Sequence, residues 1–312
     1  RSTLFPYTTL FRSLADHANL VPWQELCART GARLRWLELT EDGRVDASAG
    51  AVARAVTERT RVIALAHASN VTGALTPLDA VLAAARAVGA TVLLDTCQSG
   101  AHLPLDFAAL SAAGVDAMVL SSHKMLGPTG IGALVATEEL LEAMPPVLTG
   151  GSMIEAVRMD SSTYMSGPAR FEAGSQPLAQ AAGWIAAADY LARLGLDRLH
   201  AGERALTRRA LDGLASVPGV RVLGPADTAD RLGVIAFSVE GVHPHDVGQV
   251  LDAAGVAVRT GHHCAQPIHA ALGVRASSRV SFGPTTTPRE IDRFLEAVCQ
   301  RSEERRVGKE CR

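Results

Sequence analysis

Four short apolar runs decide the fold of this chain: RVIALAH (61–67), TVLLD (91–95), AMVLS (117–121) and IGALVA (131–136). Amphipathic stretches rich in alanine and leucine lie between them, at residues 76–88 and 107–113. Thr76 and Pro77 are a helix start signal, because the first amides of a helix need a side-chain acceptor and the missing N–H of proline costs nothing there. Apolar strands that alternate with helices predict an α/β fold, with a mostly parallel sheet covered by helices on both faces.

The pattern changes after residue 149. Residues 150–175 are rich in glycine and serine and have no clear periodicity, which predicts a long, functional loop. Beyond it we expect a helix pair over about 177–214, strands at 220–223 and 233–238, and helices near 245–254 and 288–298. These shorter elements predict a second, smaller α+β domain.

The two ends of the chain share a feature that evolved protein termini have no reason to show. In antiparallel register, TLFPYTTLFRS (3–13) and RSEERRVGKEC (301–311) can be coded by reverse-complementary triplets at every facing pair, as for Thr3 and Cys311 (ACA, TGT). Such a pattern is typical of adapter DNA translated at both ends of a fragment, so both tails are left out of the fold prediction. The part between them is then expected to start inside a longer protein.

The predicted organisation therefore has four parts. They are a foreign tail (1–13), a large α/β domain that lacks its N-terminal part (14–185), a small C-terminal α+β domain (186–300) and a second foreign tail (301–312).

Composition excludes several classes of protein. Of the 312 residues 47% are hydrophobic and 20% are charged, as in a globular protein with a substantial core. No apolar run approaches the roughly 20 residues that span a bilayer, which argues against an integral membrane protein. The 30 lysines and arginines nearly balance the 32 acidic residues, so no basic surface for nucleic acid is expected. The widely spaced cysteines form no CxxC pair and favour a cytoplasmic protein.

Lys124 is one of only two lysines in the chain, and the other, Lys309, lies in the excluded tail. A primary amine can form a Schiff base, whereas the guanidinium that serves at the other basic positions cannot. Lys124 also follows a strand, in SSHKMLGPTG (121–130), a polar turn whose hydroxyls and amides suit a phosphate. The alternative is an ordinary surface cation left by a coding bias toward arginine.

Asp95 ends an apolar strand in LLDTCQ (93–98). A carboxylate at this place can keep a pyridinium nitrogen protonated, as in pyridoxal-phosphate enzymes, and Gln98 can then hydrogen-bond the phenolic oxygen of the ring. The alternative is a cap or turn residue, which is the commoner role of a lone aspartate.

Cys264 lies in RTGHHCAQP (259–267), where an arginine and two histidines favour the thiolate, the nucleophilic form of cysteine. A buried structural cysteine is one alternative. A metal site formed with His262 and His263 is another, although adjacent side chains rarely converge on one ion.

Two further residues can bind a substrate. Arg279 begins a short strand near the C-terminus, where its guanidinium can clamp a carboxylate in a bidentate manner, or else form a surface ion pair. Asn70 lies in HASNVTG (67–73) after the strand at 61–67, and its alternative role is to shape the loop.

Together these segments resemble the type II cysteine desulfurases, the group that includes selenocysteine lyases, within the class V aminotransferase family. Seven segments keep the order of the family: HANLVPWQ (17–24), HASNVTG (67–73), LLDTCQ (93–98), SSHKMLGPTGIG (121–132), RFEAGS (170–175), RLGVIAF (231–237) and RTGHHCAQP (259–267). The resemblance implies the pyridoxal-phosphate fold type I, with the cofactor bound by the large domain. It also implies a homodimer whose active sites lie at the subunit boundary.

The resemblance assigns a role to each matching cofactor residue. Lys124 matches the lysine that forms the Schiff base with pyridoxal 5'-phosphate, Asp95 the partner of the pyridinium nitrogen and Gln98 the group near the phenolic oxygen. Ser121 and His123 match phosphate ligands.

Roles also follow for the substrate and the partner subunit. Ser175 matches a hydroxyl supplied by the partner subunit. Asn70 and Arg279 match residues that bind the substrate carboxylate, with Arg259 as a further candidate, and Cys264 matches the nucleophile.

The chain departs from the family pattern at two places. The family has a histidine doublet before Ala-Asn, whose first member stacks on the cofactor ring, whereas here Asp16 precedes His17. His17 is therefore the candidate for the ring contact. The N-terminal segment of the family, with its phosphate loop, is expected to be absent.

The function implied by the resemblance is a cysteine desulfurase. L-cysteine would become L-alanine, and its sulfur would pass to Cys264 and on to an acceptor protein for iron–sulfur cluster assembly. The alternatives are a selenocysteine lyase acting on L-selenocysteine, a class V epimerase or aminotransferase, and an inactive, truncated sulfur carrier or scaffold.

Overall fold

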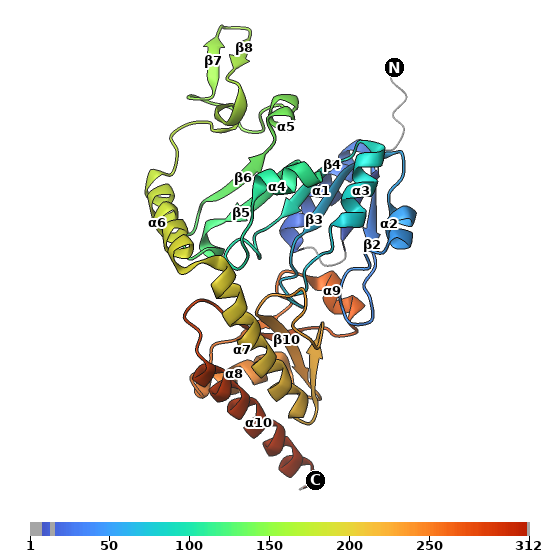
Figure 1. Ribbon diagram of the computed structural model, residues 1–312, viewed down its shortest axis with the longest axis vertical. Coiled ribbons are helices and arrows are strands. Elements are labelled where there is room, and N and C mark those ends of the chain that lie inside the picture. The colour runs from blue at the N-terminus through green and yellow to red at the C-terminus, as the bar shows by residue number, and fades with distance from the viewer. Residues whose placement is uncertain (1–7, 13–15, 311–312) are drawn as a thin grey trace.

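The larger part of the molecule is built on a six-stranded sheet of order β2-β1-β3-β4-β5-β6 (Figure 1). The computed structural model describes the backbone of residues 8–12 and 16–310 and the side chains of residues 16–300. The strands are β1 (Thr8–Arg12), β2 (Arg33–Leu37), β3 (Thr60–Ala66), β4 (Thr91–Asp95), β5 (Ala117–Ser121) and β6 (Gly132–Ala136). Neighbours are parallel except for β6, which runs antiparallel to β5. The mostly parallel sheet predicted from the sequence is confirmed.

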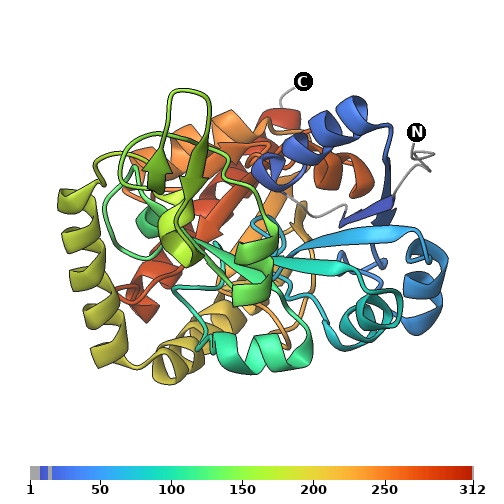
Figure 2. The same cartoon turned by 90° about the horizontal axis from the view of Figure 1, so that it is seen from above.

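Helices cover both faces of this sheet. They are α1 (Val21–Thr30), α2 (Ala49–Ala55), α3 (Asp79–Val88), α4 (Phe107–Ala113) and α5 (Glu138–Ala143). Seen from above, α1 lies on one side of the strands, and α3 and α4 lie on the other (Figure 2). The central strands β3 and β4 are consequently buried, with Ile63, Leu65 and Leu94 wholly inaccessible to solvent.

Two strands of this sheet were not predicted. β1 lies in the segment that the sequence analysis left out of the fold, and it pairs in parallel with both β2 and β3. β2 mixes arginine with apolar residues at the edge of the sheet, and three of its five residues are exposed. An edge strand of this kind lacks the continuous apolar run that marks a strand buried on both faces.

The second part of the molecule is an antiparallel sheet of order β11-β12-β10-β9. Its strands are β9 (Val220–Leu223), β10 (Val234–Val239), β11 (Arg259–Gly261) and β12 (Ser277–Ser281). Its helices are α7 (Leu196–Ser216), α8 (Pro244–Ala253), α9 (Gln266–Ala271) and α10 (Pro288–Glu310). Phe237 and Phe294 pack edge to face in its core, with ring centroids 5.7 Å apart. The predicted smaller α+β unit is present, although α10 continues well beyond residue 298.

The stretch 150–175 is not wholly a loop, contrary to the expectation. It forms a two-stranded antiparallel hairpin of β7 (Ile154–Val157) and β8 (Ser162–Tyr164), which projects from one end of the molecule (Figure 1). Nearly all residues of both strands are exposed, so neither face has to be apolar and no alternating pattern arises in the sequence.

α6 (Leu178–Leu194) connects the two parts and ends at Gly195, from which α7 starts. The division at residues 185 and 186 falls within α6 and stays a prediction. Among the described residues, no helix is long and apolar enough to cross a membrane.

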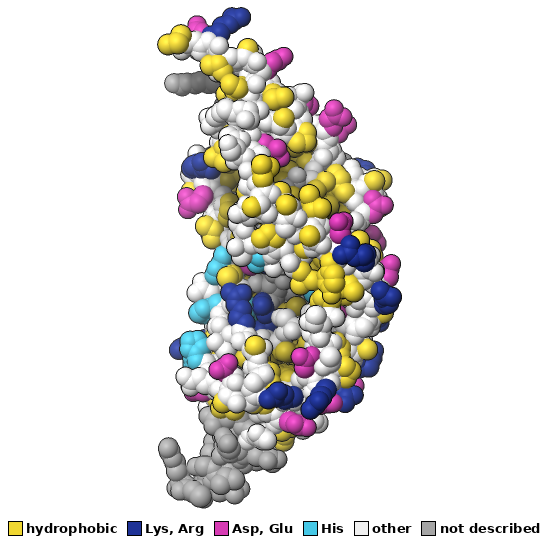
Figure 3. Space-filling view, turned by 90° about the vertical axis from the view of Figure 1, so that its left-hand side faces the viewer, with side chains coloured by type: hydrophobic (Ala, Val, Ile, Leu, Met, Phe, Trp, Pro, Cys, Tyr) yellow, Lys and Arg dark blue, Asp and Glu magenta, His cyan; other side chains and the backbone are white. Residues whose placement is uncertain are grey.

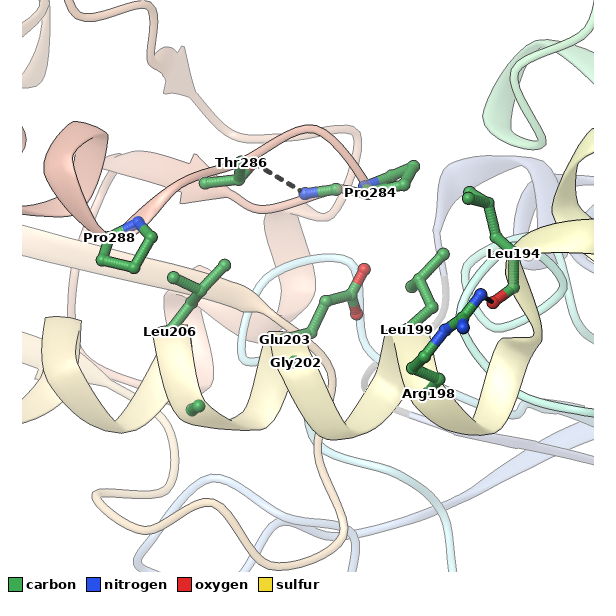
Figure 4. Close-up of a pocket in the computed structure, with 11 residues that line it drawn as sticks. Leu194, Arg198, Leu199, Gly202, Glu203, Leu206, Pro284, Thr286 and Pro288 are labelled. Atoms are coloured by element: carbon green, nitrogen blue, oxygen red, sulfur yellow. Dashed lines mark hydrogen bonds between the residues drawn. The ribbon is translucent and has the colours of Figure 1, made fainter.

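A buried polar pair joins the two parts beside α7. Glu203 on α7 is 2% exposed, and both of its carboxylate oxygens contact His102 Nδ1, at 2.7 and 2.9 Å. The carboxylate of Glu203 also faces a cavity of about 430 Å³ between α7 and the loop that carries Pro284 and Thr286 (Figure 4). The apolar walls of this cavity come from Leu199, Leu206 and neighbouring residues.

Candidate active site

A cavity of about 600 Å³ opens where the carboxyl ends of β3, β4 and β5 meet the second part of the chain. This is the edge at which open α/β sheets bind ligands. Figure 3 shows basic and histidine side chains beside a hollow near the middle of one face. The cavity is lined by Asp16, Ala18, Ala66, Ala68, Asn70, Asp95, Cys97, Gln98, Ser121, His123, Lys124, Arg259, Cys264 and Arg279.

The end of β4 brings a carboxylate, an amide and a thiol into the cavity. Asp95 Oδ1 accepts a hydrogen bond from the backbone N–H of Cys97 at 3.0 Å, and this turn places Gln98 beside it. Burial and the neighbouring Asp95 raise the pKa of Cys97 to about 12. Cys97 is thus a neutral thiol at pH 7 and lines the cavity without being a nucleophile.

The end of β5 turns directly into a short 3-10 helix over Ser122–Lys124. Ser121 Oγ lies 2.9 Å from His123 Nδ1, so a hydroxyl and an imidazole face the cavity as a pair, next to Lys124. Gly127 closes the turn, and a Cβ atom there would lie 2.3 Å from Ser122 Oγ. This close approach requires glycine and fixes the turn that carries Lys124.

Asn70 and Arg279 lie together on the opposite wall. Arg279 Nη1 donates to the backbone carbonyl of Asn70 at 2.9 Å, while its Nε has no partner among the described residues. The side-chain oxygen of Asn70 is likewise buried without a partner there. Arg259 pairs with Arg279 across β11 and β12, and burial together with this second cation lowers the pKa of Arg279 to about 10. Arg279 stays protonated at pH 7 and retains an unused donor for an anion.

Cys264 is exposed and lies at the mouth of the cavity. Arg259 Nη2 donates a hydrogen bond to Cys264 Sγ at 3.3 Å, which places a cation beside the sulfur. His263 and Cys264 both have positive φ angles, of 53° and 60°, so the chain makes a tight turn that projects the thiol. The backbone carbonyl of Cys264 accepts a hydrogen bond from the N–H of His17 at 2.7 Å.

The structure brings nine of the eleven predicted site residues to this one cavity, and leaves out His17 and Ser175. The imidazole of His17 accepts from the N–H of Gln266 at 3.2 Å, and it is Asp16 that lines the cavity. Asp16 Oδ2 accepts from Asn70 Nδ2 at 3.2 Å. Asp16 forms the wall of the cavity at this place. The predicted contact of His17 with a cofactor ring stays a prediction.

Ser175 lies apart from the cavity. It is exposed and lines a separate hollow with Ser152, Glu172 and Gly174. A position outside this chain's own cavity is the one expected for a hydroxyl that serves a second subunit.

Sequence reasoning missed the small residues of the cavity wall, Ala18, Ala66 and Ala68. Alanine carries no chemical signal, and only its place at the end of a strand or beside the loop reveals the role. Within the described residues there is no cluster of three or more histidine, cysteine or acidic side chains placed to hold a metal ion.

The donor set has a definite chemical character. A carboxylate (Asp95), a primary amine (Lys124) and a hydroxyl–imidazole pair (Ser121 and His123) surround one space. They complement a protonated ring nitrogen, an aldehyde and a phosphate respectively, three of the functional groups of pyridoxal phosphate.

Comparison with known proteins agrees with this arrangement. Residues 9–294 match the family described as Aminotransferase class-V. The chain belongs to the class V aminotransferase family. The family predicted from the seven segments is thereby confirmed, and its match extends over both sheets of the structure.

Two relatives of this class V chain carry the name of one activity. "Probable cysteine desulfurase 2" from Mycobacterium leprae is 49% identical over 285 residues, which cover 91% of this chain and 66% of the relative. "Probable cysteine desulfurase" from Streptomyces coelicolor is 48% identical and covers 91% of this chain and 67% of the relative. The chain therefore spans about two thirds of the length of these relatives.

A solved structure of the same family has the same fold. The cysteine desulfurase CsdA from Escherichia coli, in its S-sulfonic acid form, superposes with a TM-score of 0.89 and 36% identity, over 96% of this chain and 72% of that chain. The predicted fold class, the pyridoxal-phosphate fold type I, is confirmed.

Proposed function

We propose that this chain acts as a cysteine desulfurase, which converts L-cysteine into L-alanine and takes up the sulfur on Cys264. The observation that carries the proposal is the single cavity in which the exposed thiol of Cys264, beside Arg259, faces Lys124 and Asp95. The names of the relatives support the same activity. An epimerase or aminotransferase would use Lys124 and Asp95 but would have no role for Cys264.

Pyridoxal 5'-phosphate is the cofactor that the family and the donor set support. Lys124 would hold its aldehyde, Asp95 its ring nitrogen, Gln98 its phenolic oxygen, and Ser121 with His123 its phosphate. When bound, the cofactor supplies an electron sink that acidifies the α-proton of the substrate. The fit is chemical: every functional group of the cofactor finds a complementary side chain in the cavity.

The substrate carboxylate would be held by Arg279 and by Asn70, whose Nδ2 would turn one hydrogen from the carboxylate of Asp16 to that of the substrate. Arg279 Nε has no partner among the described residues, and a carboxylate can accept from Nε and Nη2 of one guanidinium in a bidentate manner. The side chain of Asn70 is fixed by its bond to the carbonyl of His263 at 2.5 Å, which keeps the amide in place. The amine of Lys124 is the group placed to accept the α-proton.

Cys264 would carry out the transfer of sulfur. Its sulfur, in the thiolate form, would attack the sulfur atom of the substrate, so that an S–S bond forms and the Cβ–S bond of the substrate breaks. The electron pair of the broken bond stays on the carbon skeleton, which takes up protons and leaves as alanine. The enzyme keeps one extra sulfur atom as a persulfide on Cys264.

We also propose a homodimer, because large apolar side chains are exposed along α6. Leu178 and Ile185 on α6 are 76% and 63% exposed. Figure 3 shows hydrophobic side chains gathered over the upper half of the face that contains this helix. In such a dimer Ser175, which lies outside its own cavity, would reach the cavity of the partner.

The next acceptor of the sulfur would be a protein of iron–sulfur cluster assembly, since the exposed position of Cys264 leaves the persulfide open to a second protein. A cytoplasmic location is proposed with it. Cys97, Cys264 and Cys299 are free thiols, which persist in a reducing compartment.

The test measures the formation of alanine from L-cysteine. The chain is incubated with pyridoxal phosphate and L-cysteine, and alanine is quantified by mass spectrometry. We expect steady production of alanine, and its loss in Cys264→Ser but not in Cys27→Ser, a variant of a cysteine on α1. Alanine production that is equal in Cys264→Ser and in the unsubstituted chain would contradict the proposal.

A further inference from the structure

The loop that carries Cys264 is held at every backbone carbonyl from residue 262 to residue 265. The four acceptors and their donors are His262 O from Ala265 N (2.8 Å), His263 O from Asn70 Nδ2 (2.5 Å), Cys264 O from His17 N (2.7 Å) and Ala265 O from His269 Nδ1 (2.9 Å). Three of these donors lie outside the loop, so its shape depends on side chains and segments around it.

The loop depends on this external support because two of its residues have an unfavourable backbone conformation. His263 and Cys264 are consecutive, non-glycine residues in the left-handed region, with φ of 53° and 60°. L-residues adopt this region rarely because Cβ crowds the following carbonyl. Two such residues in a row persist only where surrounding contacts define the backbone.

A chain of three buried side chains runs beneath the loop. Ser277 Oγ lies 2.9 Å from His263 Nε2 and 2.9 Å from His269 Nε2. All three residues are at most 2% exposed. Ser277 on β12 thus links the ring of His263, adjacent to Cys264, to the ring of His269 on α9.

The partners determine the direction of each hydrogen bond. The carbonyl of Ala265 can only accept, so His269 Nδ1 carries the proton and its Nε2 accepts from the hydroxyl of Ser277. Ser277 Oγ then accepts from Nε2–H of His263. Burial lowers the pKa of His269, and burial beside Arg279 lowers the pKa of His263 to about 3, so both rings are neutral at pH 7.

We propose that Ser277 and His269 are positioning residues for the sulfur-accepting thiol: the chain Ala265 O–His269–Ser277–His263 holds Cys264 in its left-handed turn and so keeps the thiol beside Arg259. This role rests on the proposed function, in which Cys264 receives the sulfur. Neither Ser277 nor His269 lines the cavity, so they act through the loop and not on the substrate.

The test measures the reactivity of Cys264 itself. The rate of alkylation by iodoacetamide is followed on the Cys264 peptide by mass spectrometry, at pH 7 and at pH 10. The ratio of the two rates reports the immediate surroundings of the sulfur, including its contact with Arg259, because a change in accessibility alone alters both rates equally. We expect Ser277→Ala to lower this ratio by about five- to tenfold, the loss expected for one buried hydrogen bond.

Ser278→Ala is the matched control. Ser278 is the next residue on β12 and is 1% exposed, against 0% for Ser277. Its hydroxyl donates to the carbonyl of Pro244 at 3.2 Å, away from the Cys264 loop. This variant removes the same group from the same strand, and we expect the ratio to stay that of the unsubstituted chain.

A second variant covers the case in which Ser277→Ala does not fold. In His269→Asn the side-chain amide can still donate to the carbonyl of Ala265, but the link to Ser277 is lost, and we expect the same fall in the ratio. A ratio in these variants equal to that of Ser278→Ala would overturn the positioning role.

The measurement needs neither cofactor nor turnover, which separates the two proposals. A failure of the unsubstituted chain to form alanine would count against the proposed function and would leave the alkylation ratio as it is. A normal production of alanine together with an unchanged ratio in Ser277→Ala would overturn the positioning role alone.

Discussion

At the scale of single residues, Asp95 combines two carboxylate roles that the sequence leaves open as alternatives. Asp95 accepts a hydrogen bond from the backbone N–H of Cys97, as a turn residue does, and it also lines the cavity opposite Lys124. The local turn and the ligand contact are thus compatible in one side chain. The two alternatives given for Asp95 do not exclude each other.

The substitution Asp95→Asn tests the charge of this residue. The asparagine side-chain oxygen can still accept from Cys97, so the turn is retained, while the negative charge opposite the ring nitrogen is removed. We expect the rate of alanine formation to fall by about 100-fold, as for other preorganised electrostatic groups. Asp106→Asn, at the exposed N-cap of α4 and outside the cavity lining, is the control and should keep full activity. Equal rates in the two variants would refute a role for the Asp95 charge.

The pKa of His263 makes stability depend on pH. Burial and the neighbouring Arg279 lower this pKa from 6.5 to about 3 in the folded chain. Between these pH values the unfolded chain binds a proton that the folded chain does not. The free energy of unfolding therefore decreases as the pH falls from 6.5 toward 3, by at most about 1.4 kcal/mol per pH unit for this group.

His263→Gln should reduce this pH dependence. The glutamine amide can still donate to Ser277, but it does not titrate. Melting temperatures between pH 7 and pH 4.5 are expected to fall less steeply in this variant than in the unsubstituted chain. His245→Gln, on the exposed surface of α8, should behave like the unsubstituted chain. Parallel curves for His263→Gln and the unsubstituted chain would disprove the assignment.

At the scale of elements, Arg231 fixes the loop that carries Asn70. It is 1% exposed, and burial lowers its pKa to about 10. Its guanidinium donates to the carbonyls of Pro225, Thr72 (3.0 Å) and Val234 (2.7 Å). One side chain thereby ties the loop after β3, which carries Asn70, to the start of β10.

Arg231→Lys removes most of these bonds while retaining the charge. An ammonium cannot reach three carbonyls in different directions, so at least one buried acceptor is left without a donor. We expect a loss of roughly 2–3 kcal/mol in the free energy of unfolding, measured by urea denaturation. Arg221→Lys, which loses one exposed bond to the carbonyl of Leu272, should change it by less than about 0.5 kcal/mol. A similar loss in both variants would mean that Arg231 has no special structural role.

The sequence predicts elements well where burial imposes a pattern. The runs at 61–67, 91–95 and 117–121 are β3, β4 and β5 within one residue, because strands buried on both faces must be continuously apolar. The hairpin of β7 and β8 and the edge strand β2 have exposed side chains and impose no such pattern. Their identity depends on pairing with distant segments, which a single sequence does not show.

The site residues, too, could be predicted only where the sequence itself carries a signal. Lys124 and Asp95 were found because their chemistry and their place at the ends of strands stand out in the sequence, and Cys264 because an arginine and two histidines lie near it. The roles of Ser277 and His269 depend on the contact of β12 and α9 beneath the Cys264 loop. They are eight positions apart in the chain, and this spacing indicates nothing about a shared partner.

At the scale of the whole molecule, the exposed apolar face of α6 is the strongest indication of self-association. The prediction is that the chain forms dimers and that Ile185→Glu, at a position that is 63% exposed, converts them to monomers in analytical ultracentrifugation. Trp36→Glu, at a 57% exposed position on the distant edge strand β2, is the control and should remain dimeric. A monomeric unsubstituted chain would contradict the proposed dimer.

The central claim is that the sulfur of L-cysteine passes to Cys264, and one measurement tests it directly. The chain, loaded with pyridoxal phosphate, is given a stoichiometric amount of L-cysteine, quenched with an alkylating reagent and mapped by peptide mass spectrometry. The account predicts one extra sulfur atom on the Cys264 peptide and an equal amount of alanine in solution. Alanine formed while Cys264 carries no added sulfur, or sulfur found on Cys97 or another cysteine instead, would contradict it.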